Sequence, residues 1–166
     1  MDKIIVSSDG WLECNGLRLP CALGKNGVTA DKIEGDSKTP LGNWPVRRMF
    51  YRPDRVAPPQ SALETIPLTP QHGWCDDAAH PLYNTLVSLP FTGRHEDLWR
   101  EDPRYNYILE LGYNDAPIIP GKGSAIFLHV ATKDRWFTEG CIALLEEDVA
   151  ALIPKLRPTT QLHVTV

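Results

Sequence analysis

The chain reads Ser124-Ala-Ile-Phe-Leu-His-Val-Ala131 and then, after a polar segment, Thr138-Glu-Gly-Cys-Ile-Ala-Leu144. Alternate side chains of a strand fall on opposite faces, so the first stretch divides into two sets. These are Ile126, Leu128 and Val130 on one face, and Ala125, Phe127 and His129 on the other. Both faces are mainly apolar, which is typical of a strand in the middle of a sheet. We therefore predict a central strand that carries His129 near its end.

Cys141 directly follows Gly140, and the polar residues 132–139 are long enough to return it to the side of His129. A thiolate is a strong nucleophile, and a neighbouring imidazole is the usual group that generates one. Gly140 has no side chain, so the N–H groups of Gly140 and Cys141 would be open to an oxyanion. Taken singly, Cys141 also fits a buried structural thiol. If it meets His129 in a cleft, we expect fast alkylation below about pH 8.

The catalytic segment of the YkuD-type L,D-transpeptidases has a histidine followed by Ser/Thr-x-Gly-Cys-(Ile/Val)-Arg-(Met/Leu), and this chain resembles it. The matching residues are His129, Thr138, Gly140, Cys141, Ile142 and Leu144. A looser resemblance covers Asp36-Ser-Lys-Thr-Pro-Leu-Gly42, where the family often has a Thr-Pro-x-Gly turn. Ala143 departs from the usual arginine, although some branches of the family carry Gly-Cys-(Ile/Val)-Ala-Leu.

The resemblance implies a mainly β fold, a YkuD-like β-sandwich with one principal helix after the catalytic cysteine. It also implies a cysteine acyltransferase without a cofactor, in which Cys141, His129 and Gly140 form the catalytic site. The implied partners are peptidoglycan stem peptides or muropeptides, which would form a thioester on Cys141. Transfer of the acyl group to an amine would make the protein an L,D-transpeptidase, and transfer to water an L,D-carboxypeptidase. The sequence leaves this choice and the oligomeric state open.

In the family, the arginine that Ala143 replaces is thought to position the substrate. Either the substrate preference differs here, or Arg135 or Arg104 provides a cation from elsewhere. The predicted substrate-binding residues are Thr138, Arg135, Trp74, Tyr113 and Asn114. Trp136 and Phe137 precede Thr138 and either cover a bound acyl group or anchor their loop to the core.

The chain has 166 residues, which favours a single domain over residues 1–166, and the resemblance implies that this domain is catalytic. The formal net charge of −4 is mild. No run of lysine and arginine stands out, so we expect no nucleic-acid partner. The four cysteines form no Cys-x-x-Cys pair and no histidine stands at zinc-finger spacing. We therefore expect no metal site.

The first residues, Met1-Asp-Lys-Ile-Ile-Val-Ser-Ser8, lack the apolar run of a signal peptide, and no stretch has the length of a membrane helix. As it stands, the sequence predicts a cytoplasmic protein, or a periplasmic or cell-wall protein if a leader was removed. A cytoplasmic location fits a rival function, a cysteine peptidase or amidase that acts on other peptides. Ala143 fits a second rival, a catalytically silent module that binds peptides or glycans.

Alternation and turn signals predict strands at 3–8, 11–14, 17–23, 44–52, 105–111 and 161–166, the last as an edge or half-buried strand. Residues 24–42 are predicted to form a loop. The proline-rich residues 53–104 are predicted to form a long irregular insertion with one helical turn at 96–100. Apolar residues at helical spacing behind three acidic residues predict a helix at 145–156, which Pro154 must kink or shorten.

Overall fold

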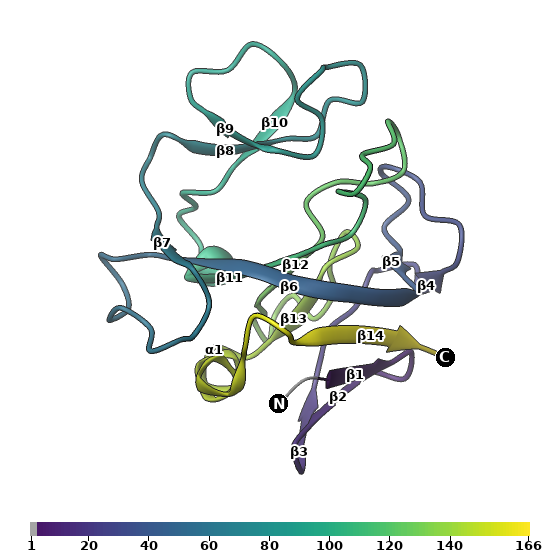
Figure 1. Ribbon diagram of the computed structural model, residues 1–166, viewed down its shortest axis with the longest axis vertical. Helices are drawn as coiled ribbons and strands as arrows, with labels where there is room; N and C mark the ends of the chain where they lie inside the picture. Colours follow the sequence, from purple (N-terminus) through teal and green to yellow (C-terminus); the bar gives the residue numbers. More distant parts are fainter. Residues whose placement is uncertain (1–2) are drawn as a thin grey trace.

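The computed structural model describes residues 3–166, and strands dominate it (Figure 1). The main sheet has nine strands in the order β13-β12-β11-β6-β14-β1-β2-β3, with β7 paired to β6. Their bounds are β1 Lys3–Ser7, β2 Trp11–Cys14, β3 Leu17–Pro20, β6 Gly42–Tyr51, β7 Thr65–Pro67, β11 Tyr107–Leu111, β12 Phe127–Val130, β13 Ile142–Leu144 and β14 Gln161–Thr165. The mainly β fold with one principal helix after Cys141 is therefore confirmed.

The helix, α1 (Glu146–Leu152), begins with Glu146, Glu147 and Asp148, where carboxylates face the positive end of the helix dipole. It ends earlier than predicted, because Pro154 lacks an N–H group and the chain continues as the 3-10 turn Ile153–Lys155. A second 3-10 turn covers Pro103–Tyr105. Within residues 3–166, no helix combines the length and the apolar character needed to cross a bilayer.

The N-terminal hairpins form where the sequence predicts them. Asn15 and Gly16, between β2 and β3, have positive φ angles of 45° and 80°, as a two-residue hairpin turn requires. The C-terminal strand β14 pairs in parallel with β1 and antiparallel with β6. It is therefore an inner, half-buried strand, and the edge alternative is wrong.

Residues 53–104 are irregular for most of their length, but they include short strands. β8 (His72–Cys75) pairs with β9 (Leu86–Ser88) and β10 (His95–Asp97) in a separate sheet, drawn above the main sheet in Figure 1. The helical turn predicted at 96–100 is wrong, because β10 occupies its start. Residues 24–42 likewise contain a two-stranded sheet of β4 (Val28–Thr29) and β5 (Thr39–Pro40).

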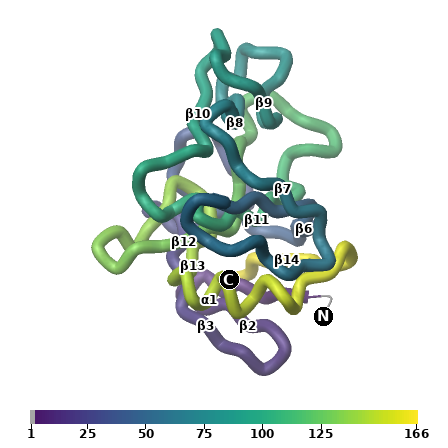
Figure 2. The backbone as a smooth tube through the Cα atoms, turned by 90° about the vertical axis from the view of Figure 1, so that its left-hand side faces the viewer, coloured from purple at the N-terminus to yellow at the C-terminus, as the bar shows by residue number. Residues whose placement is uncertain are grey.

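The two faces of β12 and β13 serve different purposes. Leu128 and Val130, with Ile142 and Leu144, join the main core beside Val149 and Leu152 of α1. Figure 2 shows α1 against these strands, on the side away from β8–β10. Phe127 and Cys141 instead belong to a second cluster, with Trp74, Leu98 and Tyr105. The predicted alternation along residues 124–131 therefore separates the main core from the region around Cys141.

We predict that the inner position of β14 can be tested at Leu162, which is completely buried between β1 and β6. Leu162→Ala should lower the free energy of unfolding by about 2–5 kcal/mol, because it leaves a cavity in the core. Urea denaturation measures this loss. The matched control is Leu82→Ala, at a side chain that is 47% exposed, which should cost about 0.5 kcal/mol or less. Equal losses would contradict the assigned position of β14.

Candidate active site

The parallel pairing of β12 and β13 brings the predicted nucleophile to the predicted base. His129 stands opposite Ala143 and Leu128 opposite Ile142, so Cys141 lies beside Phe127 at the start of β12. Side chains alternate along a strand, and Cys141 and His129 therefore project from the same face. Both line one cavity of about 390 Å³.

The His129 ring is oriented by the backbone of its own strand. Its Nδ1 lies 2.9 Å from the carbonyl oxygen of Val130. A carbonyl only accepts hydrogen bonds, so Nδ1 carries the proton and Nε2 is the basic nitrogen. The sequence could not locate this partner. Burial lowers the pKa of His129 to about 4, although the contact with Val130 opposes this.

The Cys141 thiol donates a hydrogen bond to the Ala125 carbonyl at 3.1 Å, and its Sγ accepts one from the Phe127 N–H at 3.4 Å. The residue is 9% exposed. Burial raises the pKa of Cys141 to about 12, against the opposing effect of the Phe127 N–H. The free site therefore holds a neutral thiol and a neutral imidazole. This arrangement does not favour the fast alkylation below about pH 8 that the sequence led us to expect.

The turn before Cys141 is fixed by two threonine hydroxyls. Thr138 Oγ1 accepts from the Gly140 N–H at 3.0 Å and donates to the Cys141 carbonyl at 2.6 Å. Thr39 Oγ1 lies 3.4 Å from the same carbonyl and accepts from the Gly24 N–H at 2.9 Å. Thr138 thus lines the cavity but mainly positions the chain. The Gly140 N–H already donates to Thr138 and is not free to bind an oxyanion. Of the two predicted oxyanion donors, only the Cys141 N–H therefore remains a candidate.

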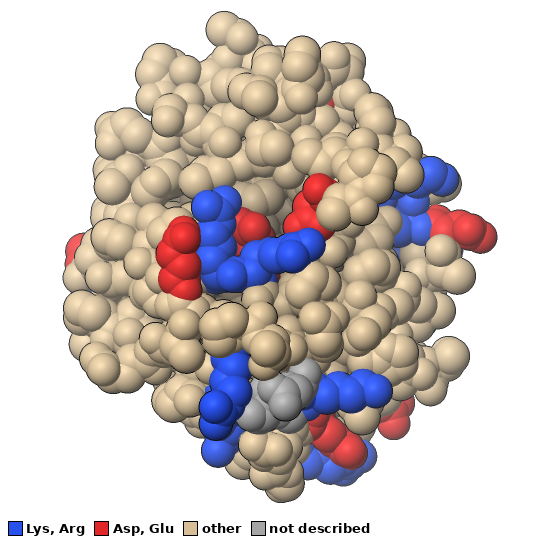
Figure 3. Space-filling model, in the orientation of Figure 1, with Lys and Arg blue, Asp and Glu red and all other residues tan. Residues whose placement is uncertain are grey.

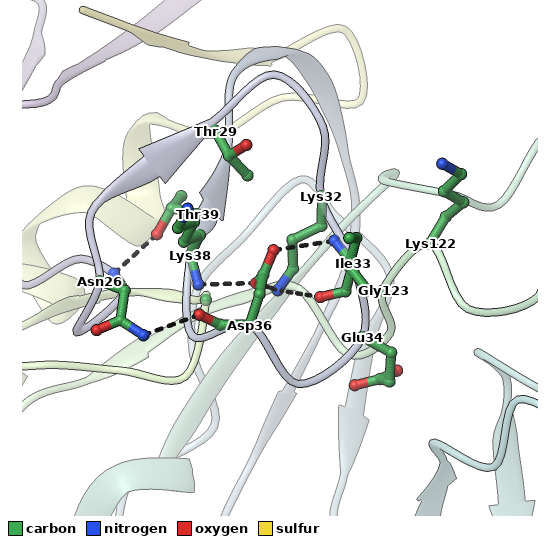
Figure 4. A network of polar contacts seen from close by, with 12 residues as sticks. Asn26, Thr29, Lys32, Ile33, Glu34, Asp36, Lys38, Thr39, Lys122 and Gly123 are labelled. Atoms are coloured by element: carbon green, nitrogen blue, oxygen red, sulfur yellow. Dashed lines mark hydrogen bonds and ion pairs between the residues drawn. The ribbon is translucent and has the colours of Figure 1, made fainter.

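The loop that carries Thr39 is ordered by Asp36 (Figure 4). Its carboxylate accepts from Lys32 Nζ at 2.5 Å and from the backbone N–H groups of Ile33 and Lys38 at 2.9 Å. Burial works against the charge, but these hydrogen bonds hold the pKa of Asp36 below its ordinary value. The buried Lys32 lines the cavity, so the loop brings a cation to the turn at Gly140.

Ala143, which replaces the family's arginine, is buried in a small cluster with Ala22 and Ala131. Its backbone pairs with that of Ala22, which covers this edge of β13. A guanidinium here would displace that packing. The cavity obtains its cations elsewhere, from Lys32, Arg94, Arg100, Arg104 and Arg135.

Arg135 differs from the other arginines of the cavity. Arg94 pairs with Asp76, and both Arg100 and Arg104 pair with Asp102. Among the ion pairs of residues 3–166 none includes Arg135, and its buried Nε has no hydrogen-bond partner there. Its guanidinium lies 4.9 Å from the ring centre of Phe137, which also lines the cavity and is 38% exposed. The neighbouring Trp136 is 39% exposed.

Trp74, Tyr113 and Asn114, predicted to bind substrate, are not among the residues that line this cavity. Trp74 is buried and its Nε1 donates to Asn84 Oδ1 at 3.0 Å. The hydroxyl of Tyr113 donates to the Lys122 carbonyl, and Asn114 binds backbone groups of Ile119 and Gly123. The structure therefore brings neither Tyr113 nor Asn114 to the cavity of Cys141 and His129, whereas Trp74 packs in the same buried cluster as Cys141 without reaching the cavity.

Two residues that the sequence did not point to lie in the cavity, Glu96 and Tyr105. The Tyr105 hydroxyl donates to Glu96 Oε1 at 2.9 Å. Glu96 was assigned to a helical turn and Tyr105 to a strand face, and nothing local in the sequence pairs them. Asn84 supports the site from outside the cavity, because its Oδ1 accepts a hydrogen bond from the N–H of Ala125, the residue whose carbonyl group binds the Cys141 thiol. In the described part of the chain, no group of three or more His, Cys, Asp and Glu side chains is placed to hold a metal ion.

On the face shown in Figure 3, basic and acidic side chains gather next to one another over the middle of the molecule. The strand β6 makes two ion pairs of this kind, Arg47 with Asp115 and Arg48 with Glu110. The part above, where Figure 1 draws β8–β10, is mostly neutral on this face.

Comparison with known proteins agrees with the sequence pattern. The family model of the L,D-transpeptidase catalytic domain, YkuD, matches residues 6–164. Among solved structures, the chain is similar to an L,D-transpeptidase from Mycobacterium smegmatis, with 12% identity and a TM-score of 0.46. The match covers 99% of this chain and 58% of that one, so this chain spans little more than half of that protein's length. No curated protein matches the chain.

The turn before Cys141 should tolerate only glycine at position 140. Gly140 has a φ of +142°, and a Cβ there would lie 2.9 Å from the Lys38 carbonyl oxygen. Gly140→Ala should therefore lower the free energy of unfolding by about 2 kcal/mol or more. The control is Gly121→Ala, which also has a positive φ but meets nothing within 4 Å. If both variants lose the same stability in urea denaturation, the close contact at Gly140 is refuted.

The rate at which iodoacetamide alkylates Cys141 should rise with pH up to at least pH 10 and show no plateau near neutrality. Only the thiolate reacts, and the pKa of about 12 keeps its fraction small below that value. Peptide mapping by mass spectrometry follows Cys141 separately from Cys14, Cys21 and Cys75. A rate that levels off near pH 7 would mean that His129 already holds the thiol proton in the free protein.

Proposed function

The chain belongs to the family of YkuD L,D-transpeptidase catalytic domains, and from this premise we propose that it is a cysteine acyltransferase acting on peptidoglycan stem peptides. The observation that carries the proposal is that Cys141 and His129 line the same cavity while the Val130 carbonyl leaves His129 Nε2 free to act as a base. A structural cysteine has no need of an oriented imidazole beside it.

In the first half-reaction, Cys141 attacks the carbonyl of the third residue of a tetrapeptide stem. His129 Nε2 takes the thiol proton as the sulfur attacks, since both groups are neutral in the free site. The N–H of Cys141 stabilises the oxyanion, and the protonated His129 then gives its proton to the leaving amine of the terminal D-alanine. The product is a thioester on Cys141.

In the second half-reaction, an amine of another stem or a water molecule attacks the thioester and releases Cys141. The amine gives a cross-link and water gives a shortened stem. Five cationic side chains line the cavity, and among them Arg135 has no ion pair within residues 3–166. This supports a role for Arg135 in holding a substrate carboxylate, which a guanidinium binds through two parallel hydrogen bonds. Arg104, already paired with Asp102, adds positive potential beside it.

One observation favours the silent binding module as a second candidate. The Cys141 thiol is buried and donates to the Ala125 carbonyl, so the sulfur must leave this contact before it can attack. In a binding module it would keep that contact permanently. The cysteine peptidase or amidase uses the same chemistry as the wall enzyme and differs from it only in substrate.

A carbapenem, which acylates many enzymes of this family, should form a covalent adduct on the intact protein, visible as a mass increase. The adduct should be lost in Cys141→Ala and reduced about 100-fold or more in rate in His129→Gln, because the general base is removed. Cys75→Ala, at another buried cysteine, is the matched control and should still be acylated. A folded wild-type protein without an adduct would support the silent module.

The substrate is identified by incubation with a disaccharide-tetrapeptide. Release of D-alanine supports the wall enzyme, whereas an adduct with the carbapenem but no D-alanine supports the peptidase or amidase.

A further inference from the structure

One ionisable side chain of the cavity has no part in the reaction described above. Glu96 extends from β10 and lines the cavity together with Cys141 and His129. Its Oε1 accepts a hydrogen bond from the Tyr105 hydroxyl at 2.9 Å. The Tyr105 ring stands edge-on to the His129 imidazole, with 5.3 Å between the ring centres, and edge-on to Phe127 at 5.9 Å. The carboxyl group is therefore fixed in place beside the catalytic pair.

The charged neighbours of Glu96 are occupied with other partners. Arg94 pairs with Asp76 at 3.2 Å, and Arg100 pairs with Asp102 at 2.7 Å. No ion pair among residues 3–166 includes Glu96. The cavity thus presents a carboxyl group that an arriving cation can bind.

We propose that Glu96 is the residue that binds the acceptor amine and removes its proton in the second half-reaction. This inference rests on the function proposed above. An amine acceptor arrives as an ammonium ion, which is attracted to a carboxylate but has no lone pair with which to attack. Glu96 would supply both the charge that binds the ammonium ion and the base that removes its proton.

Two protons leave the acceptor nitrogen during this step, one to each of two residues. The Glu96 carboxylate takes one proton from the ammonium group, and the neutral amine attacks the thioester carbonyl to form the new C–N bond. His129 accepts a second proton from that nitrogen. The C–S bond then breaks, the Cys141 thiolate leaves, and it takes the proton from His129. Glu96 returns its proton to solvent before the next acceptor binds.

The basicity of the two residues supports this division of labour. Burial raises the pKa of Glu96 to about 7, while the hydrogen bond from Tyr105 and the charge of Arg100 oppose the rise and the charges of Asp76 and Glu139 add to it. The pKa of His129, lowered to about 4, makes its imidazole a weaker base toward an ammonium ion. Near neutral pH, Glu96 both holds and releases protons readily.

The test uses the full chain with a disaccharide-tetrapeptide as donor and acceptor, and mass spectrometry measures the ratio of cross-linked dimer to hydrolysed tripeptide. Glu96→Gln should lower this ratio by about 100-fold, which is the usual contribution of a general base. Its carbapenem adduct should persist, because acylation does not use Glu96. Hydroxylamine, which is unprotonated at neutral pH, should capture the acyl group equally well from the wild type and the variant.

Two further variants separate a proton-transfer role from a structural one. Asp97→Asn removes an exposed carboxylate next to Glu96 on β10 that does not line the cavity, and it should leave the ratio nearly unchanged. In the wild type the ratio should rise with pH and level off above about 7, as Glu96 ionises. In Glu96→Gln the ratio should keep rising above pH 7, because only amine that is already deprotonated in solution can then attack. Tyr105→Phe removes the hydrogen bond that stabilises the carboxylate, so the rise should move to higher pH.

Three results would overturn the inference. The first is a ratio of dimer to tripeptide in Glu96→Gln that equals the wild-type ratio. The second is a loss of acyl transfer to hydroxylamine in Glu96→Gln as large as the loss of transfer to the stem amine. The third is a wild-type protein whose acyl group is transferred to water and never to an amine. If the wild type forms no adduct at all, the proposed function itself fails, and the two failures are thereby distinguished.

Discussion

The carbonyl group of Cys141, bound by two threonine hydroxyls, is the contact on which the arrangement of the site depends. Thr138 comes from the turn itself, and Thr39 comes from the distant N-terminal loop. The same loop is ordered by Asp36 and pairs with the turn through Gly24 and Thr138. Because Gly140 leaves no room for a side chain between turn and loop, the two segments fix each other. Cys141 is therefore positioned by these tertiary contacts as well as by the pairing of β13, the strand that follows it, with β12.

The sheet supplies rigidity to this arrangement from its other face. Residues of β12 and β13 alternate between the main core beside α1 and the region around Cys141. Each pleat that buries Leu128 or Val130 also fixes the direction of Phe127 or His129. Stability and site geometry are thus linked through the same short strands.

The parts of the structure that a local pattern encodes were predictable. The alternation of residues 124–131 gave the central strand, and Asn15-Gly16 gave a hairpin whose positive φ angles only such residues adopt readily. The Gly-Cys segment with its upstream histidine pointed to two residues that line one cavity. Pairings between distant segments were not predictable. β10 is too short to show a pattern, and its strand character comes from β8. Glu96 and Tyr105 meet only because of that pairing. The side chains of Trp74, Tyr113 and Asn114 make structural contacts that no spacing in the sequence reveals.

The hydrogen bond from the Cys141 thiol to the Ala125 carbonyl group should protect the sulfur from oxidation. Peroxides attack thiolates, and a sulfur that keeps its proton on a fixed carbonyl is a poor target. Ala125 has a φ of +53° and its N–H is bound by Asn84, so this acceptor does not drift away in the resting protein. In the reaction proposed above, the sulfur becomes vulnerable only when a bound substrate draws it out of this contact. Damage by oxidants should therefore accumulate during turnover and not during storage.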